Sequence, residues 1–381
     1  MTATTASTAT AGGGAPRIAR VETSLLRLPL HTPFVTALRR TTTIETVLVR
    51  LTDTDGCTGW GEAPQVWQVT GDSLAGSRAC LDGPLADALV AAPADPGETA
   101  PIIQRAVVGN RSAKMAADVA LHDLAARRAG VPLAVHLARL AGRPVGAGAA
   151  TRVRTDVTLA AGDAAGLAQA AQQRVADGFG TLKLKVGTDA ATDVARVRAV
   201  RDAVGPDIGL RLDANQGWDA FAAIAVIRAL EDAGVGVEVV EQPVPAGDVL
   251  GLAHVTAHVE TPIMADESLF TLEDLVEIIR CDAADLVNVK LAKCGGLTPA
   301  LELLGVAQRH GFGTFVGSMM ESHVGIGAAA SLVAAVGVTS LPDLDAAWWA
   351  SESPYDGGVT YDRDEICLPA RPGLGIEGVT P

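Results

Sequence analysis

The sequence predicts an α/β protein in which a (β/α)₈-type barrel follows a smaller α+β domain. Two observations lead to this prediction. The chain has 381 residues, which is more than a typical single domain, and its hydrophobic pattern changes near Thr151. After that point, short aliphatic or β-branched runs alternate with helical stretches of roughly a dozen residues, a rhythm typical of repeated βα units.

The first part of the chain predicts the α+β domain. Apolar and polar residues alternate in Thr46–Thr52, and the turn signal Asp55-Gly56 leads to a second such run, Cys57–Glu62, so we expect an antiparallel hairpin. An Ala-rich stretch, Ser112–Ala129, ends at a glycine and predicts a long helix.

The second part predicts eight strands with helices between them, as in a barrel. The strand candidates are Thr155–Leu159, Thr181–Val186, Gly209–Leu212, Val237–Val240, Pro262–Ala265, Leu286–Val289, Thr314–Gly317 and a last one near Ser340. Polar residues recur on these strands or where they end, namely Lys183, Lys185, Asp213, Asn215, Glu241, Asp266, Glu267, Lys290, Ser318, Asp343 and Asp345. Because the carboxyl ends of all barrel strands meet at one mouth, where active sites of this architecture lie, we expect a ring of polar side chains there.

Three carboxylates of this ring, Asp213, Glu241 and Asp266, come from adjacent strands. Packed together, they require a cation to neutralise them, and carboxylate oxygens favour Mg²⁺. We therefore expect a magnesium site that leaves positions open for a substrate carboxylate. Each carboxylate alone could instead cap the next helix or pair with an arginine, but the three together favour the metal.

Lysines make up the other half of the ring. Lys183 and Lys185 alternate with leucines on the second strand, so both face the barrel interior. Burial and repulsion between the two ammonium groups are expected to lower the pKa of at least one, which makes a competent base. Lys290 follows the sixth strand, across the expected metal, and two bases on opposite faces of a carbon acid can invert its stereocentre. Lys293 is expected to serve the following loop or to face solvent, and a role at the site stays open as the alternative.

Composition limits the partners and the compartment. The formal net charge of −14 argues against nucleic acid and against an anionic membrane surface. Five scattered cysteines without metal-ligand spacing favour a reducing compartment. Residues 1–16 predict a disordered tail and not a signal peptide, and no stretch is long and apolar enough to span a bilayer. We expect a cytoplasmic protein that acts on a small molecule.

The polar ring forms motifs that resemble the enolase superfamily, in particular its muconate-lactonizing subgroup, from about Arg17 to Ile376. The motifs are Lys183-Leu184-Lys185, Asp213-Ala214-Asn215, Glu241-Gln242-Pro243, Ala265-Asp266-Glu267-Ser268 and Lys290 before Lys293-Cys294-Gly295-Gly296. The resemblance implies a (β/α)₇β barrel over residues 146–345 and an α+β capping domain formed by residues 17–145 and completed by residues 346–381.

The same resemblance implies the roles of the ring residues. Asp213, Glu241 and Asp266 are expected to bind one Mg²⁺ per subunit, with Asn215 and Glu267 in support. Lys185 and Lys290 are expected to form the acid/base pair, and Lys183 to act as a supporting cation. A homo-oligomer is expected on the same grounds.

Within the subgroup, the chain most resembles dipeptide epimerases of the L-Ala-D/L-Glu type. Asp343-Leu344-Asp345 matches the Asp-x-Asp pair that holds the free ammonium group of the dipeptide in those enzymes, and paired carboxylates suit a cationic amino terminus. Arg39 matches the position that binds an acidic side chain on the second residue. Thr158, Ser318 and Met319 match further positions near the substrate. The resemblance therefore implies an isomerase that inverts the α-carbon of the second residue of Ala-Glu-like dipeptides by proton transfer between two lysines, through a metal-stabilised enolate.

Other activities remain open. o-Succinylbenzoate synthesis, N-acylamino acid racemisation and cycloisomerisation use the same metal and lysines, but a substrate without an ammonium group gains nothing from Asp343 and Asp345. A Schiff-base aldolase with Lys290 as nucleophile and a catalytically silent metal-binding protein are further alternatives. The capping loops depart from the family pattern at Trp67 and at Trp348-Trp349, so the side chain of the second residue is the least determined part of the prediction.

Overall fold

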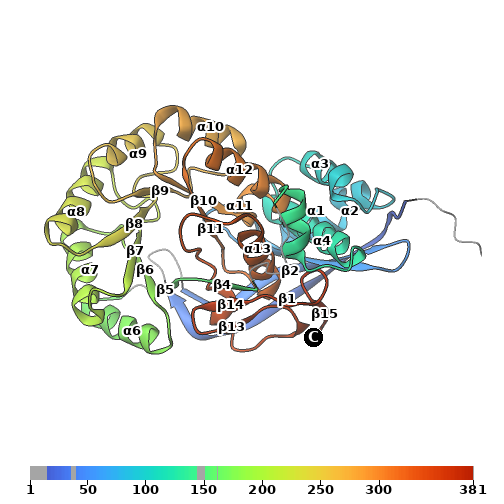
Figure 1. The fold of residues 1–381 in the computed structure, drawn as a ribbon, viewed down its shortest axis with the longest axis horizontal. Coiled ribbons are helices and arrows are strands. Elements are labelled where there is room, and N and C mark those ends of the chain that lie inside the picture. The colour runs from blue at the N-terminus through green and yellow to red at the C-terminus, as the bar shows by residue number, and fades with distance from the viewer. Residues whose placement is uncertain (1–14, 36–39, 144–150, 161, 381) are drawn as a thin grey trace, which may run out of the picture.

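The computed structural model describes residues 15–35, 40–143, 151–160 and 162–380 of the chain. A curled parallel sheet lies at one side of the molecule with helices along its outer face, and a second unit packs against it (Figure 1). Arg39 falls outside the described residues.

The curled sheet has seven parallel strands in the order β11-β10-β9-β8-β7-β6-β5. In chain order they are β5 (Val157–Leu159), β6 (Thr181–Lys185), β7 (Gly209–Asp213), β8 (Val237–Glu241), β9 (Ile263–Ala265), β10 (Leu286–Lys290) and β11 (Gly313–Gly317). The helices that follow them are α6 (Ala164–Ala176), α7 (Ala190–Val204), α8 (Ala220–Asp232), α9 (Val249–Thr256), α10 (Leu272–Cys281), α11 (Leu291–Cys294), α12 (Leu297–Arg309) and α13 (His323–Val336). The first seven strand candidates are thus confirmed, with small shifts at their ends.

The last strand, predicted near Ser340, is not a regular strand. Asp343 pairs with Gly317 of β11 in an isolated parallel bridge, and the Asp156 N–H, just before β5, donates to the Pro342 carbonyl at 3.2 Å. Pro342 has no N–H of its own, so a continuous ladder of hydrogen bonds cannot form here. The segment therefore joins the two edge strands of the sheet through single contacts.

The capping unit begins with an antiparallel sheet of β1 (Ile18–Val35), β2 (Arg40–Asp53) and β3 (Thr58–Pro64), which confirms the predicted hairpin. The helices α1 (Leu74–Asp82), α2 (Pro84–Leu89), α3 (Pro96–Ala106), α4 (Arg111–Arg128) and α5 (Leu133–Leu140) follow. The long helix α4, also predicted, packs directly on β3, because a Cβ atom on Gly61 would lie only 2.0 Å from the Ala116 carbonyl oxygen. Only glycine allows the two backbones to approach so closely.

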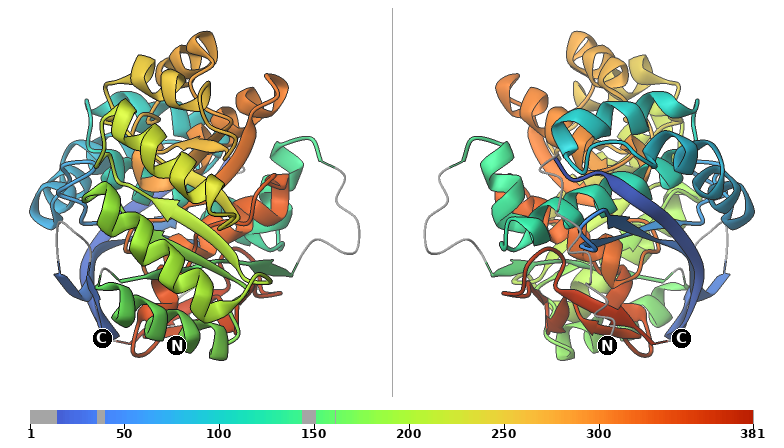
Figure 2. Two further views of the ribbon diagram at one scale, coloured as in Figure 1. Left: turned by 90° about the vertical axis from the view of Figure 1, so that its left-hand side faces the viewer. Right: turned by 90° about the vertical axis from the view of Figure 1, so that its right-hand side faces the viewer.

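The end of the chain returns to the capping unit. The strands β13 (Thr360–Asp362) and β14 (Glu365–Cys367) form a sheet with β4 (Arg152–Arg154), and β12 (Tyr355–Gly357) pairs with β15 (Ile376–Val379). Arg127 of α4 donates a hydrogen bond to the Ile376 carbonyl, and the Leu374 N–H donates to the Asp123 carboxylate at 2.6 Å. Figure 2 presents the row of barrel helices in one side view and the capping unit in the other.

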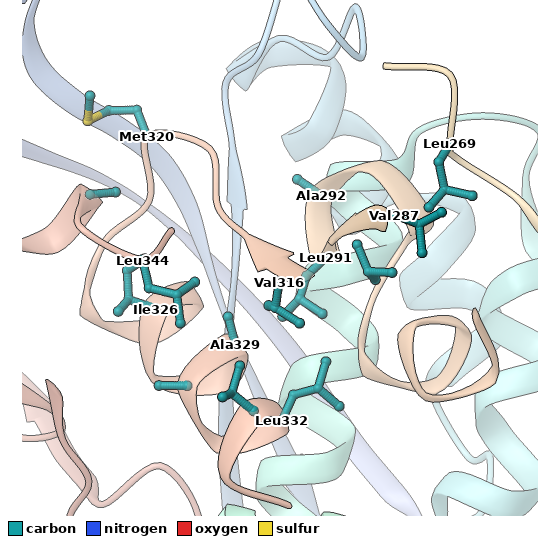
Figure 3. Packing of buried hydrophobic residues seen from close by; sticks show 14 of the residues in the cluster. Leu269, Val287, Leu291, Ala292, Val316, Met320, Ile326, Ala329, Leu332 and Leu344 are labelled. Atoms are coloured by element: carbon teal, nitrogen blue, oxygen red, sulfur yellow. The ribbon is translucent and has the colours of Figure 1, made fainter. Parts of the chain in front are cut away.

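A hydrophobic core extends from the barrel into the capping unit. Figure 3 shows a part of it, in which Val316 of β11 and Leu291 of α11 pack near Ile326 and Leu332 of α13. Burying an aliphatic side chain of this size stabilises a fold by about 1.5–3 kcal/mol, so these contacts hold the strand ends in place. Among the described residues, no helix is long and apolar enough to cross a membrane.

Candidate active site

The carboxyl ends of β6 to β10 bring the predicted carboxylates and lysines to one mouth of the barrel. The parallel register sets Lys185 beside Asp213, and Asp213 beside Glu241, on neighbouring strands. Asp266 directly follows β9, and Lys290 is the last residue of β10. The three carboxylates are almost fully buried. Side-chain alternation explains why both lysines of β6 point to the mouth, because Leu182 and Leu184, which alternate with them, pack in the hydrophobic core on the other face.

Ammonium groups lie directly against the three carboxylates. Lys183 Nζ lies 2.6 Å from Glu241 Oε2 and 3.1 Å from Asp213 Oδ2. Lys185 Nζ lies 2.6 Å from the same Asp213 oxygen, and Lys290 Nζ lies 2.7 Å from Asp266 Oδ2. In the part of the chain that the structure describes, the carboxylates are therefore bridged by lysines and are not gathered as a ready-made set of three metal-ligating side chains.

The donor atoms nevertheless fit magnesium. Besides the three carboxylates, the buried atoms Glu267 Oε2 and Asn288 Oδ1 have no hydrogen-bond donor within the described residues. Asn215 Nδ2 donates to the other Glu267 oxygen at 3.1 Å, and Asn288 Nδ2 donates to Glu241 at 2.9 Å. Buried acceptors without a donor are costly, and a mouth lined by hard oxygen atoms suits Mg²⁺ better than a softer metal.

Lys185 and Lys290 reach the carboxylates from different strands. In the sheet order, β6 and β10 are separated by β7, β8 and β9. The two ammonium groups accordingly contact different carboxylates, Asp213 for Lys185 and Asp266 for Lys290. This arrangement leaves one amine on each side of the carboxylate group.

The carboxylates govern the pKa of the buried lysines. Burial by itself lowers the pKa of Lys290, but Asp266 and Glu241 outweigh burial and raise that pKa well above its usual range. For Lys183 burial likewise lowers the pKa, and Asp213 with its neighbouring carboxylates raises it further than burial lowers it. The pKa depression expected for at least one of the two lysines of β6 does not occur at Lys183, because nearby carboxylates dominate.

Lys293 also belongs to this site, so the expectation that it serves the following loop or solvent is wrong. Its side chain is only 1% exposed, and its ammonium group donates to both the carboxylate and the backbone carbonyl of Asp266. The residue lies in the short helix α11, directly after β10. Strand alternation could not indicate its direction, because side chains in a helical turn follow a different period.

The two aspartates of the Asp-x-Asp pair have different surroundings, and Asp343 is the one in contact with Lys183. Asp343 Oδ2 lies 2.7 Å from Lys183 Nζ. Asp345 Oδ2 accepts hydrogen bonds from the Thr158 N–H at 2.8 Å and from Trp349 Nε1 at 2.9 Å. Burial, followed by the charge of Asp343, raises the pKa of Asp345 to about 7. The contact of Trp349 was not predicted, although a residue four positions after an aspartate in a helical turn is a usual partner for it.

The loop after β11 approaches the same mouth. The Ser318 hydroxyl donates to the backbone carbonyl of Asp343 at 3.3 Å, and Met319 follows it with a half-buried side chain. Next in the chain, Met320 lines a cavity of about 330 Å³ against the capping unit, together with residues such as Arg40. Trp67, 58% exposed, lines the same cavity.

Glu62 of β3 ties the capping unit to this loop, a contact that sequence reasoning missed. Its carboxylate accepts hydrogen bonds from the Ser322 N–H at 2.9 Å and from the Gly325 N–H at 2.6 Å, at the start of α13. Burial, followed by the charge of Glu62, raises the pKa of Glu321 to about 8. The available signal was a lone carboxylate in an otherwise buried strand, which requires a partner.

Comparison with known proteins assigns the fold to a family. Residues 19–137 match the family described as the mandelate racemase / muconate lactonizing enzyme, N-terminal domain, and residues 166–379 match the enolase C-terminal domain-like family. The chain therefore belongs to the mandelate racemase / muconate lactonizing enzyme family, whose C-terminal part has the enolase-like domain. The resemblance to the enolase superfamily and the predicted fold class are thereby confirmed.

Individual members of the family are similar over nearly the whole chain. The L-Ala-D/L-Glu epimerase of Bacillus subtilis is 41% identical over 95% of this chain and 97% of its own. The structure of a substrate-liganded complex of the Bacillus subtilis enzyme superposes with a TM-score of 0.90 and covers 96% of this chain and 100% of that one. The dipeptide epimerase of Enterococcus faecalis V583, solved with Mg and the dipeptide L-Leu-L-Tyr, is 35% identical, with a TM-score of 0.85 and coverage of 95% and 100%.

Proposed function

We propose that the chain is a Mg²⁺-dependent dipeptide epimerase, an isomerase that inverts the α-carbon of the second residue of a dipeptide. The observation that carries the proposal is that Lys185 and Lys290, on strands β6 and β10, flank a group of buried carboxylates. The relatives named as dipeptide epimerases support the substrate class.

Lys185 and Lys290 are proposed to move one proton each. One lysine, as a neutral amine, accepts the proton of the substrate α-carbon on its Nζ, and the electron pair of the broken C–H bond stays on the substrate next to its carboxylate. The other lysine, as an ammonium, donates a proton from its Nζ to the opposite face of the same carbon. The α-carbon is inverted, and the two lysines have exchanged protonation states. Lys183, between the carboxylates, stays charged throughout.

Asp213, Glu241 and Asp266 are proposed to hold one Mg²⁺ per subunit, with Asn215 and Glu267 in support. Held there, the ion would supply positive charge for the substrate carboxylate and for the negative charge that develops beside it. Lys293 keeps the Asp266 side chain in one orientation through its hydrogen bonds.

The substrate is proposed to bind with its ammonium group at Asp343 and Asp345. Thr158, Ser318 and Met319 are proposed to complete this end of the site. Thr158 supports the assignment because its N–H holds the Asp345 carboxylate in place at 2.8 Å. Arg39 is proposed to bind an acidic side chain on the second residue.

A specific observation favours a second candidate, an apolar second residue. The cavity of about 330 Å³ between the loop after β11 and the capping unit is lined by Met320 and by the exposed ring of Trp67. Most of the other lining residues, such as Arg40, Glu45 and Gln65, are polar. Only the part formed by Met320 and Trp67 therefore gains free energy by burying an apolar side chain. The function test therefore has to separate acidic from apolar dipeptides.

The test is deuterium exchange. The protein is incubated with Mg²⁺ and a library of L,L-dipeptides in D₂O, and mass spectrometry reads deuterium at each α-carbon. We expect exchange and inversion at the second residue. Inversion is expected to be lost in both Lys185→Ala and Lys290→Ala, and exchange of an L,L-dipeptide is expected to be lost in the variant that lacks the lysine on the side of its α-hydrogen, because each lysine serves one face of the carbon. The Arg39→Met variant is expected to reduce exchange with Ala-Glu-like dipeptides and to leave apolar dipeptides unaffected.

Each outcome decides one part of the proposal. Exchange confined to apolar or basic dipeptides keeps the two-lysine mechanism and overturns the role of Arg39. Absence of exchange with every dipeptide, but exchange with N-acylamino acids or turnover of a succinylbenzoate precursor, overturns the dipeptide assignment. Borohydride trapping of a substrate on Lys290 would overturn the mechanism itself, because it reports a Schiff base.

We also propose a homo-oligomer in the cytoplasm, with no nucleic acid or membrane as partner. The free thiols of all five cysteines support a reducing compartment. We propose domain boundaries at residues 17–145 with 346–381 for the cap and 146–345 for the barrel. The hydrogen bond from the Leu374 N–H to the Asp123 carboxylate supports this division, because it joins the chain's end to α4 of the cap.

A further inference from the structure

A second cavity, of about 380 Å³, lies where the capping unit meets the barrel helices. Its walls come from α3 and α4 of the cap and from α10, α11 and α12 of the barrel, and it shares no lining residue with the mouth described above. We call it the seam cavity. Arg111 and Lys114 line it from the cap, and Glu273 and Glu302 line it from the barrel with exposed side chains.

The two cations stand at an unfavourable place for positive charge. Arg111 and Lys114 are among the first four residues of α4, and no acidic residue occupies the first turn. The preceding residue, Asn110, makes no side-chain capping bond to this helix. The amino end of a helix carries partial positive charge from its free N–H groups, so cations there are destabilised. The Ser112 N–H and hydroxyl of this first turn donate to the Asp72 carboxylate at 3.1 and 2.9 Å, and that contact leaves the Arg111 and Lys114 side chains without an ion-pair partner.

The ammonium group of Lys114 is buried without a counter-charge. The residue is 8% exposed, and its Nζ donates to the backbone carbonyl of Gln104 at 2.9 Å. In the described part of the chain, neither Lys114 nor Arg111 has a carboxylate within ion-pair distance. Burial, and then the charge of Arg111, lower the pKa of Lys114. Buried charges are normally paired, so this lysine calls for a negative partner.

The guanidinium of Arg111 is fixed at the edge of the cavity. Its Nη1 donates to the backbone carbonyls of Phe270 at 3.3 Å and Lys293 at 3.2 Å. The guanidinium carbon lies 5.2 Å from the centre of the Phe270 ring, which holds its plane. Those bonds use only one of its terminal nitrogens, so its fork keeps donors for a further acceptor.

We propose that the seam cavity binds a small phosphate-type oxyanion between the Arg111 guanidinium and the Lys114 ammonium. Phosphate oxygens match the planar fork of arginine and accept from an ammonium. The exposed carboxylates of Glu273 and Glu302 stand at the barrel side of the cavity and are screened by water. Free phosphate and a phosphate monoester share this chemistry.

The test is calorimetric titration of the Mg²⁺-loaded protein with inorganic phosphate and, separately, with glycerol 3-phosphate. We expect one saturable site that binds at least about ten-fold more weakly in Lys114→Met and in Arg111→Gln, the loss expected for one charge-assisted hydrogen bond. The matched control is Arg105→Gln, an equal charge change at an exposed residue of α3 outside the cavity. It is expected to bind phosphate as the unmodified protein does.

Lys114→Met keeps the buried stem of the side chain, and thermal unfolding without phosphate shows whether each variant is folded. Tighter binding of the monoester identifies an ester as the ligand, and tighter binding of inorganic phosphate identifies free phosphate. The proposal is overturned by the absence of saturable binding, by equal affinities in all four proteins, or by competition between phosphate and a dipeptide. Because Lys114 lies outside the mouth, deuterium exchange is expected to persist in Lys114→Met, so this test and the function test fail independently.

Discussion

Asp345 is the residue whose charge is most finely balanced in the proposed ammonium site. Its pKa lies at about 7 because burial and Asp343 favour the protonated form, while the hydrogen bonds from Thr158 and Trp349 favour the carboxylate. Only the ionised form attracts a substrate ammonium. Substrate binding is therefore expected to strengthen as the pH rises through this value.

Trp349→Phe tests this balance. Removing the indole N–H removes a donor to the carboxylate, so the pKa of Asp345 rises and less of it is ionised near neutrality. We expect KM for the dipeptide to increase about three- to ten-fold near pH 6 with little change in kcat. The difference is expected to narrow towards about pH 8, where the carboxylate ionises in both proteins. Steady-state kinetics over this range provide the measurement.

The matched control is Trp348→Phe, which alters the neighbouring indole and leaves the bond to Asp345 intact. It is expected to keep the pH dependence of the unmodified protein. An equal rise of KM in both variants, or a rise that does not change with pH, would contradict the role assigned to the Trp349 N–H.

Single residues also show where sequence reasoning works. Lys185 and Asp213 could be located because strand alternation and the position of a strand end determine which way a side chain points. Glu62 could not, because its partners Ser322 and Gly325 are 260 or more positions away in the chain. Lys293 could not either, since its direction depends on the turn that α11 makes after β10.

Among the elements, the start of α13 joins the cap to the barrel mouth through two buried carboxyl groups. Glu62 reaches across from β3 to the helix N–H groups, and Glu321 lies close by, because a Cβ on Gly325 would meet an oxygen of each within 2.5 Å. Two neighbouring carboxylates in one buried space repel each other, so the folded state favours a proton between them. Lys290, His323 and Tyr355 are the other ionisable groups that approach this pair.

This pair makes stability depend on pH. The pKa of Glu321 is about 8 in the folded protein and near its ordinary value when unfolded. Between these two pKa values the folded state binds one proton more than the unfolded state. The stability that this proton contributes is therefore lost as the pH rises from about 5 to about 8. Glu321→Gln is expected to flatten this decline by up to about 1.4 kcal/mol per pH unit. Denaturant unfolding at a series of pH values measures it.

The control is Glu277→Gln, which makes the same change at an exposed residue of α10. It is expected to leave the pH dependence of the unfolding free energy unaltered. If the free energy of unfolding depends on pH in the same way in Glu321→Gln and in the unmodified protein, Glu321 is ionised in the folded state and no proton is shared with Glu62.

In the whole molecule, the barrel could be predicted because each βα unit is encoded by its own short segment. The exception is the last strand, where Pro342 removes a ladder donor and leaves a single bridge at Asp343. The way in which the cap closes on the barrel could not be predicted, because it depends on contacts between distant segments, such as that of Arg127 with Ile376. The seam cavity results from the same packing of distant segments, so no local sequence pattern predicts it.

At the scale of the whole molecule, lysines also contribute to neutralising the buried carboxylates of the barrel mouth. The carboxylates Asp213, Glu241 and Asp266 face the ammonium groups of Lys183, Lys185, Lys290 and Lys293. Ion pairs of this kind remove the repulsion that would otherwise open the mouth. Loss of Mg²⁺ is therefore expected to abolish the proposed chemistry and to preserve the fold.

Treatment with EDTA tests this expectation at the level of the whole protein. We expect deuterium exchange to fall more than about a hundred-fold, because the substrate carboxylate loses its cation. Circular dichroism is expected to stay unchanged, and the free energy of unfolding is expected to fall by only the few kcal/mol that a bound ion contributes at about a hundred times its dissociation constant. Activity should return when Mg²⁺ is restored. Unfolding at room temperature on addition of EDTA would instead mean that the lysines do not neutralise the carboxylates, and exchange that persists would mean that no metal takes part.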